Sequence, residues 1–186
     1  MNETLKSIKN RRSVRVYQVK QIKEEELQSI LEAGMYAPSA RDQQSWQFTV
    51  IQNTELINKI SKAAQEEYKK SNDKFIQQFA NNENFHIFHK APTVVIISGD
   101  ENSMAAQVDC ALATENMLIA AESVGIGSCW VSAAPNIINT KNYAELNKQL
   151  CIPNGFRPIY SITLGYKAIE TINYMPRKAD IVNYVR

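Results

Sequence analysis

The sequence has no long hydrophobic run. No stretch of its 186 residues approaches the roughly 18 apolar residues that a membrane-spanning helix needs. The first residues, MNETLKSIKNRRSVRVY, contain no apolar segment of the kind found in a secretory signal peptide. We therefore expect a soluble cytoplasmic protein that does not bind a membrane.

Cysteine and excess charge are also scarce. The three cysteines, Cys110, Cys129 and Cys151, lack the spacing of a zinc site or a disulfide framework, which predicts buried free thiols. Lys and Arg total 21 against 19 Asp and Glu, and this net charge of +2 gives no reason to expect a nucleic-acid partner. His86 and His89 have no carboxylate or cysteine at metal-ligand spacing, so no metal site is predicted.

Several common catalytic and nucleotide-binding motifs are missing as well. The sequence contains no GxSxG, no GxxxxGK[ST] and no GxGxxG after a strand, and the pair Gly125 and Gly127 is too short for the dinucleotide-binding motif. These absences weigh against hydrolase, P-loop and Rossmann functions. The hydrophobic content of 44% and the charged content of 22% are those of a globular protein, and we expect a single domain, residues 1–186.

The pattern of apolar residues predicts a mixture of helices and strands. Helices are expected at 3–10, from Glu24 to a stop at Pro38, through the sixties, at 103–124 and at 143–150. Strands are expected at 46–52, 93–98, 128–132 and 158–165. The continuous apolar run TVVIIS is typical of a strand buried on both faces, which implies a covered sheet. Residues 166–186 show no clear helical period before Asp180 and are expected to form an extended arm.

The helix expected at 103–124 is apolar on nearly all sides. Its polar exceptions, Asp109, Asn116 and Ser123, are spaced by seven residues. A helix of this kind must be buried on most sides, and in a small protein a subunit interface buries it more easily than one core does. We therefore expect a homodimer. Asn116 is either an internally bonded polar residue or a ligand contact, and Trp46 is expected in the core.

A basic cluster follows the first helix. Arg11, Arg12 and Arg15 supply guanidinium groups and Ser13 supplies a hydroxyl, which together suit a phosphate and a polar ring edge. Such a cluster is more often a solvated face, so its spacing alone does not decide between the two interpretations.

Four segments resemble, in their order and spacing, those of the FMN-dependent nitroreductases. They are RRSVRVY, APSARDQQSWQFTVI, AAESVGIGSCWVSA and RPIYSITLGY, and the resemblance covers nearly the whole chain. It implies an α+β fold of three layers, α/β/α, with a mainly antiparallel central sheet, and an intertwined homodimer with two FMN sites at the interface. Residues 61–89 match poorly, and in that family this region builds much of the substrate pocket.

The resemblance assigns a first set of cofactor-binding residues, which are basic or carry a hydroxyl. They are Arg11, Arg12, Ser13, Arg15, Arg177 and Lys178. Arg11 and Ser13 match contacts to the FMN phosphate, and Arg15 matches a contact to the pyrimidine or ribityl edge. Arg177 matches a phosphate contact near the C-terminus. Arg12 lies at a more variable position, and Lys178 is the weaker neighbour of Arg177.

A second set of implied residues surrounds the flavin ring. Ser39, Asp42 and Gln44 match a segment that usually comes from the partner subunit. Main-chain groups, including an N–H aimed at flavin N5, are implied for Trp130, Val131, Ser132 and Ala133. Two residues depart from the family, which commonly has Asn in place of Asp42 and Pro in place of Ser45.

The activity that the resemblance implies is transfer of hydride from NADH or NADPH, through flavin N5, to a small flat acceptor such as a nitroaromatic or a quinone. No catalytic side chain is required, because the flavin itself accepts the hydride, and Arg15 would stabilise negative charge at the ring edge. Two alternatives stay open: a dedicated reductase of another substrate, such as an enoate, and a protein that binds or stores FMN without turnover. The sequence identifies neither the acceptor nor the preferred nicotinamide.

Overall fold

A four-stranded sheet forms the centre of the computed structural model, which describes residues 2–139, 144–169 and 175–186. The strands lie in the order β1-β2-β4-β3, and each neighbouring pair is antiparallel. They are β1 (Trp46–Ile51), β2 (Thr93–Asp100), β3 (Gly127–Trp130) and β4 (Phe156–Gly165). All four predicted strands are confirmed, with ends shifted by one or two residues.

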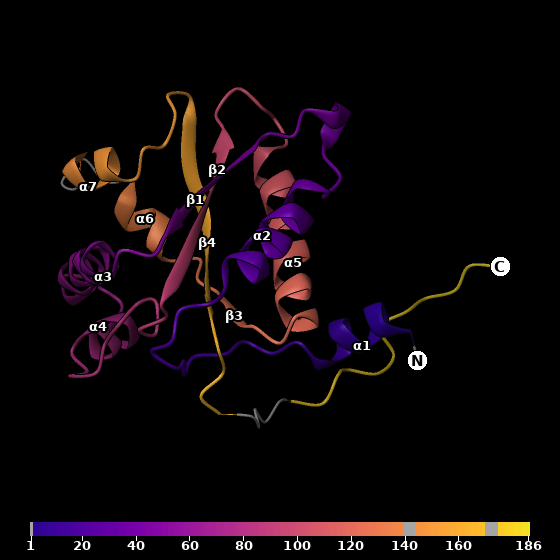
Figure 1. Ribbon diagram of the computed structural model, residues 1–186, viewed down its shortest axis with the longest axis horizontal. Helices are drawn as coiled ribbons and strands as arrows, with labels where there is room; N and C mark the ends of the chain where they lie inside the picture. Colours follow the sequence, from indigo (N-terminus) through magenta and orange to yellow (C-terminus); the bar gives the residue numbers. More distant parts are fainter. Residues whose placement is uncertain (1, 140–143, 170–174) are drawn as a thin grey trace.

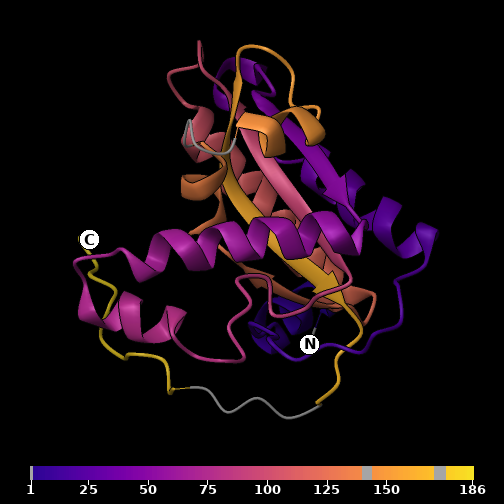
Figure 2. The ribbon, with the colours of Figure 1, turned by 90° about the vertical axis from the view of Figure 1, so that its left-hand side faces the viewer.

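Helices cover both faces of the sheet (Figure 1). One layer contains α1 (Glu3–Asn10), α2 (Glu24–Met35) and α5 (Ala106–Ser123). The other contains α3 (Thr54–Lys69), α4 (Lys74–Ala80), α6 (Ala134–Ile138) and α7 (Ala144–Gln149). Figure 2 shows α3 lying across the strands on its side of the sheet. The three-layer α+β fold expected from the sequence is confirmed.

Two helices, α4 and α6, were not predicted. They have only seven and five residues, so neither is long enough to show a helical period in the sequence. Their caps explain where they begin: the Asp73 side chain accepts hydrogen bonds from two backbone N–H groups of α4, and Pro135 stands in the first turn of α6. The second predicted helix ends at Met35, three residues before Pro38.

The core has two halves, and β2 separates them. Val95 and Ile97 pack into the cluster beneath α2 and α5, whereas Val94 and Ile96 pack into the cluster beneath α3 and α6. All four side chains are fully buried. This alternation places successive side chains on opposite faces, which confirms the prediction of a strand covered on both sides.

Helix α5 is buried on the sides that face the sheet and α2. On its outer side Val108 is 61% exposed and Leu112 is 40% exposed. On the neighbouring α1, Leu5 and Ile8 are also exposed. In a single chain these residues form an apolar face in contact with solvent, as expected if a second subunit covers it.

The remaining expectations concern the burial of Trp46, the partner of Asn116 and the burial of the three cysteines. Trp46 lies in the core, as predicted. The Asn116 side chain donates a hydrogen bond to a carbonyl of α2, which supports the first of its two interpretations. Cys110 and Cys129 are buried free thiols, but the prediction was wrong for Cys151, which is exposed because it stands in a left-handed turn after α7 and outside the core.

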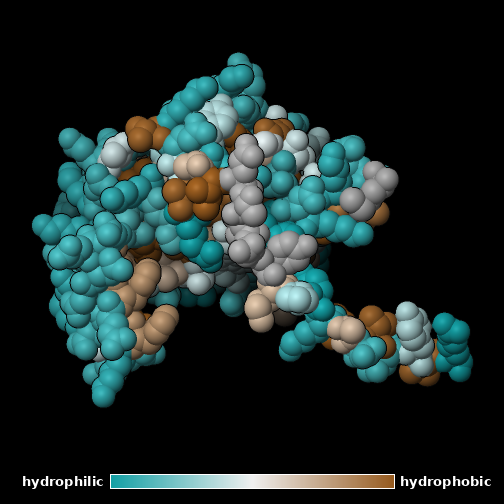
Figure 3. Space-filling view, turned by 90° about the horizontal axis from the view of Figure 1, so that it is seen from below, coloured by the Kyte–Doolittle hydropathy of each residue, from teal (hydrophilic) through white to brown (hydrophobic). Residues whose placement is uncertain are grey.

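The C-terminal residues 175–186 form an extended arm beyond α1 (Figure 1). They contain no helix, including after Asp180, and every residue of the arm is exposed. Figure 3 shows the arm projecting from the body with hydrophobic and hydrophilic side chains interleaved. Its exposed apolar residues are Met175, Ile181, Val182, Tyr184 and Val185.

Across the part of the chain that the structure describes, no helix combines the length and apolar character needed to cross a membrane.

Candidate functional site

The basic segment after α1 lies against the end of β3. The Val14 N–H donates a hydrogen bond of 2.8 Å to the Ser128 carbonyl, and Ser13 forms an isolated parallel bridge with the same residue. Val14 itself is buried. Two segments that the sequence singled out separately, 11–15 and 128–133, are therefore brought together.

Two paired glycines allow this close approach. Gly127 and Gly165 face each other at the ends of β3 and β4. A Cβ atom on Gly127 would lie 3.0 Å from a Val14 methyl group, and one on Gly165 would lie 2.9 Å from the ring of Tyr17. Any side chain at either position would push the basic segment away from the sheet.

Tyr17 fixes the far end of the basic segment. Its hydroxyl donates a hydrogen bond of 2.6 Å to the Val14 carbonyl and shares one of 2.7 Å with Thr163 Oγ1 in β4. Burial raises the pKa of Tyr17 well above its usual value, so the hydroxyl keeps its proton and remains a donor.

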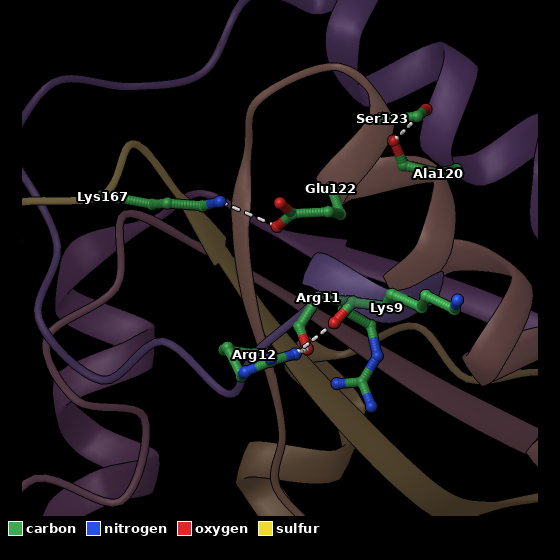
Figure 4. Close-up of polar contacts among 7 residues, drawn as sticks. All are labelled: Lys9, Arg11, Arg12, Ala120, Glu122, Ser123 and Lys167. Atoms are coloured by element: carbon green, nitrogen blue, oxygen red, sulfur yellow. Dashed lines mark hydrogen bonds and ion pairs between the residues drawn. The ribbon is translucent and has the colours of Figure 1, made fainter. Parts of the chain in front are cut away.

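The basic side chains of this segment have different surroundings. The Arg11 guanidinium lies 3.5 Å from Glu115 of α5. Arg12 turns back and donates to the carbonyl oxygens of Lys9 and Arg11, both at 2.7 Å, as Figure 4 shows. Arg15 is exposed. Arg11 and Arg15 therefore suit an anionic ligand better than Arg12, whose guanidinium already caps the end of α1.

The thiol of Cys129 in β3 lies near the basic segment. Burial raises the pKa of its thiol, while Arg15, a hydrogen bond with Ser13 and Arg11 act in the opposite direction. Three of the residues that were expected to hold FMN are thus near enough to Cys129 to influence the pKa of its thiol.

The segment Trp130–Ala133 leaves the sheet at this point. Its backbone is fixed at Val131, whose N–H donates to the Ser161 carbonyl and whose carbonyl accepts from the Ser161 hydroxyl. Ser132 is exposed, and Ala133 is the residue that precedes α6. Regular pairing between β3 and β4 ends at Trp130. The backbone beyond Val131 therefore lies outside the hydrogen-bond ladder of the sheet and is positioned by the contacts of Val131 with Ser161.

The loop from Ser39 to Ser45 is tightly wound. Arg41, Asp42 and Gln44 have φ angles of 54°, 53° and 48°, in the left-handed region that side chains disfavour. The Gln44 N–H donates to Ser39 Oγ at 2.9 Å, which closes the loop. The Gln44 side chain also donates to Asp42 Oδ1 at 3.4 Å.

A buried carboxylate anchors this loop to α5. Asp109, 2% exposed, accepts a hydrogen bond from the Ala40 N–H at 3.0 Å and one from the Ser45 hydroxyl at 2.7 Å. Ser45 is the residue that departs from the family by not being proline. Its hydroxyl provides one of the two contacts of Asp109, which gives the departure a structural role.

The basic segment and the Ser39–Ser45 loop lie at opposite ends of the sheet. Ser128, which binds the basic segment, is level with Leu164 and Thr93, whereas Ser45 binds Asp100. Thr93 and Asp100 are the two ends of β2, and at about 3.4 Å per residue they lie roughly 24 Å apart. Within one chain, the two groups of residues cannot line the same edge of a ligand ring.

Arg177 and Lys178 lie on the arm of residues 175–186, where both side chains are exposed. The structure therefore brings residues 13 and 14 to Ser128, just before the segment Trp130–Ala133, but it leaves the residues of the Ser39–Ser45 loop at the other end of the sheet. Those residues can join the site only if a second copy of the chain supplies them.

A hollow of about 290 Å³ lies next to Arg15. It is lined by Arg15, Val16, Tyr17, Asn84, His86, His89 and Lys90. Part of the poorly matching region 61–89 is thereby placed beside the expected flavin site. Burial lowers the pKa of His86 to about 4, so the ring is neutral, and its Nδ1 accepts hydrogen bonds from the N–H groups of Phe88 and Lys90.

Sequence reasoning missed three residues that shape the site: Tyr17, Asp109 and Glu115. Asp109 had a visible signal, since a carboxylate in an apolar helix needs a partner. Tyr17 and Glu115 had none, because their contacts join positions far apart in the chain. In the described ranges, no group of three or more His, Cys, Asp or Glu residues is placed to hold a metal ion.

Comparison with known proteins gives one consistent result. The family model described as the nitroreductase family matches residues 8–166. A candidate NADH dehydrogenase/NAD(P)H nitroreductase of Archaeoglobus fulgidus is 36% identical over 176 residues, which cover 91% of this chain and 88% of that protein.

Two solved structures are similar over the full length of both chains. A Bacteroides fragilis nitroreductase with bound FMN superposes with a TM-score of 0.92 at 35% identity. A Desulfitobacterium hafniense nitroreductase with bound FMN superposes with a TM-score of 0.91 at 28% identity.

Proposed function

Because the chain belongs to the nitroreductase family, we propose that it is an FMN-dependent oxidoreductase that transfers hydride from NADH or NADPH to a small flat acceptor such as a nitroaromatic or a quinone. The observation that carries the proposal is the contact of residues 13–14 with Ser128 of β3, the strand that leads into the segment Trp130–Ala133. We place this reaction in the cytoplasm, in a single domain.

The residues of the basic segment and of the backbone after β3 fit FMN. Arg11 and Ser13 would hold the phosphate through charge-assisted hydrogen bonds, and Arg15 would stabilise negative charge at the pyrimidine edge. The backbone of Val131, fixed by Ser161, would position the N–H groups that follow it. When bound, FMN supplies the redox chemistry, because its N5 accepts hydride. The protein itself therefore has to bind the FMN, orient it and stabilise negative charge on it.

We place the acceptor beside the hollow next to Arg15. The neutral His86 ring holds the turn that carries His89 and Lys90, both of which have left-handed backbone angles. The turn borders the same hollow as Arg15, so its residues would face a molecule bound over the flavin. None of the described residues that line the hollow is acidic, which favours acceptors with electron-rich oxygen atoms.

We further propose that the working form is an intertwined homodimer. The loop residues Ser39, Asp42 and Gln44, which one chain cannot bring to its own basic segment, would come from the second chain, and so would Arg177. The exposed apolar residues of α1 and α5 would be covered by their counterparts in the other subunit.

The arm also has a suitable place to bind on a second copy. Strand β1 is an edge of the sheet, and an edge strand offers unpaired backbone groups. A hollow of about 380 Å³ adjoins this edge and is lined mainly by apolar residues of α2 and β1. The interleaved apolar side chains of residues 175–186 match such a surface, so the arm of one subunit would lie along the other.

The experiment that tests this function is anaerobic reduction of the purified protein. We expect yellow protein with one FMN per chain, bleaching of the flavin by NADH or NADPH, and reoxidation by nitroaromatics or quinones. Reoxidation only by an enoate would indicate the dedicated reductase instead. A bound flavin that neither nicotinamide reduces would indicate a storage protein.

A further inference from the structure

The loop that carries Ser39, Asp42 and Gln44 is held in an unfavourable conformation. Three of its residues, none of them glycine, have left-handed φ angles. Such a backbone persists only when surrounding contacts determine it, and segments of this kind are common at ligand sites. The contacts that determine this loop therefore control where its side chains point.

Asp109 makes those contacts at both ends of the strained segment. Oδ1 accepts from the Ala40 N–H and Oδ2 accepts from the Ser45 hydroxyl, so the carboxylate brackets residues 41–44. It lies in the first turn of α5, where the helix dipole favours a negative charge. The ion pairs among the described residues do not include Asp109, so hydrogen bonds to the loop are its main compensation.

Burying the Asp109 carboxylate costs free energy of desolvation. The neighbours of Asp109 on α5, such as Cys110 and Ala113, belong to the hydrophobic core. An apolar residue would avoid the desolvation of a charge at this position. The carboxylate is explained if the loop must keep one conformation.

We propose that Asp109 is a positioning residue for FMN, and that it acts on the site of the other subunit. This inference rests on the proposed FMN-binding homodimer. Asp109 holds a loop that lies at the far end of the sheet from Arg11 and Arg15 of its own chain. The ring edge that the loop supports must therefore belong to the flavin bound by the second chain.

Mixed dimers test this assignment. Differently tagged chains carrying Arg11→Ala and Asp109→Ala are combined, the heterodimer is isolated, and FMN is titrated by fluorescence. If Asp109 acts on the other subunit, both defects fall in one site and the second site is intact. We expect one FMN per heterodimer at wild-type affinity, whereas each homodimeric variant should bind about tenfold more weakly or worse. A heterodimer with no wild-type site would overturn the proposal.

Two further variants separate positioning from general stability. Asp109→Asn keeps an acceptor for Ala40 and a polar partner for Ser45, so it should restore FMN affinity. Thr114→Ala removes a buried hydrogen bond of α5 that does not reach the loop, so it should lower the thermal stability of the apoprotein and leave the affinity unchanged. Equal losses of affinity in Thr114→Ala and Asp109→Ala would sink the proposal.

Ser45→Ala, which removes only one hydroxyl, replaces Asp109→Ala in the mixed dimer if the latter does not fold. The same complementation is then expected, and its absence counts against the proposal. The proposed function is checked separately with the wild type, since a wild-type protein without FMN or a stable monomer would contradict that function before any variant is made.

Discussion

The Nε atom of Arg11 lies 3.5 Å from Oε1 of Glu115, so the guanidinium assigned to the FMN phosphate already has an acidic neighbour. Both side chains are partly exposed, which limits the pair to about 1 kcal/mol or less. Removing the acid should leave Arg11 free for phosphate. We expect Glu115→Gln to bind FMN more tightly, with a difference that shrinks as salt is added. Weaker binding in a fluorescence titration of the apoprotein would mean that Glu115 orients Arg11.

Arg177 should contribute to FMN binding from the arm. A charge-assisted contact to phosphate is worth roughly 1.5 to 3 kcal/mol, so Arg177→Ala should weaken binding by about that amount. Arg186→Ala is a matched control, because Arg186 lies on the same arm over the ring of Tyr184. Equal effects of the two substitutions on FMN affinity would remove Arg177 from the site.

Asp42 should lower the reduction potential of bound FMN. Its carboxylate accepts a hydrogen bond from the Gln44 amide, and the ion pairs among the described residues include neither Asp42 nor Arg41. A charge of this kind disfavours an anionic reduced flavin nearby. We expect Asp42→Asn to raise the two-electron midpoint potential measured by dye equilibration. Asp73→Asn, at the N-terminus of α4, should leave it unchanged.

The hydroxyl of Tyr17 should stabilise both the fold and the FMN site. Tyr17→Phe removes its bonds to the Val14 carbonyl and to Thr163, at a cost of about 1 to 3 kcal/mol, because a buried carbonyl loses its donor. We expect a lower free energy of unfolding in urea and weaker FMN binding, since residues 11–15 lose their anchor. Tyr184→Phe on the exposed arm is the control, and a loss there as large as in Tyr17→Phe would refute the explanation.

His86 should make the protein less stable in acid. Its pKa falls from 6.5 to about 4, mainly through burial, with Lys90 and His89 adding to the effect. The folded protein therefore binds fewer protons than the unfolded chain in this window. The stability contributed by neutral His86 is complete above pH 6.5 and is lost as the pH falls toward 4.

We expect the Tm of His86→Gln to fall less than that of the wild type when the pH is lowered through this window. Asn58→Ala removes the partner of His86 Nε2 but keeps the titrating ring, so it should retain the loss. If the wild type and His86→Gln show the same acid dependence, other groups cause it.

The strands and the long helices could be predicted because their signals are local. The apolar run of β2 and the helical spacing of α2 depend on neighbouring residues only. The short helices α4 and α6 gave no such signal. Cys151 was misplaced because the burial of a thiol depends on tertiary position, and a turn after α7 leaves it outside the core.

The candidate site was predicted in parts. Its basic residues form a short run in the sequence, and the resemblance to nitroreductases linked that run to Trp130–Ala133. The contacts that organise the parts could not be predicted, because Ser45 and Asp109 are separated by 64 residues and Tyr17 and Thr163 by 146. A single sequence does not show which distant residues form such contacts.

In the proposed homodimer, the edge of β1 stays open in each new chain until the arm of another copy covers it. Residues 175–186 leave the ribosome after β1, so each new chain passes through a stage in which this edge and the outer face of α5 are uncovered. An uncovered edge strand next to apolar surface promotes aggregation. We expect newly made chains to depend on chaperones until they meet another copy, and a premature stop codon before Met175 to yield protein that proteases remove.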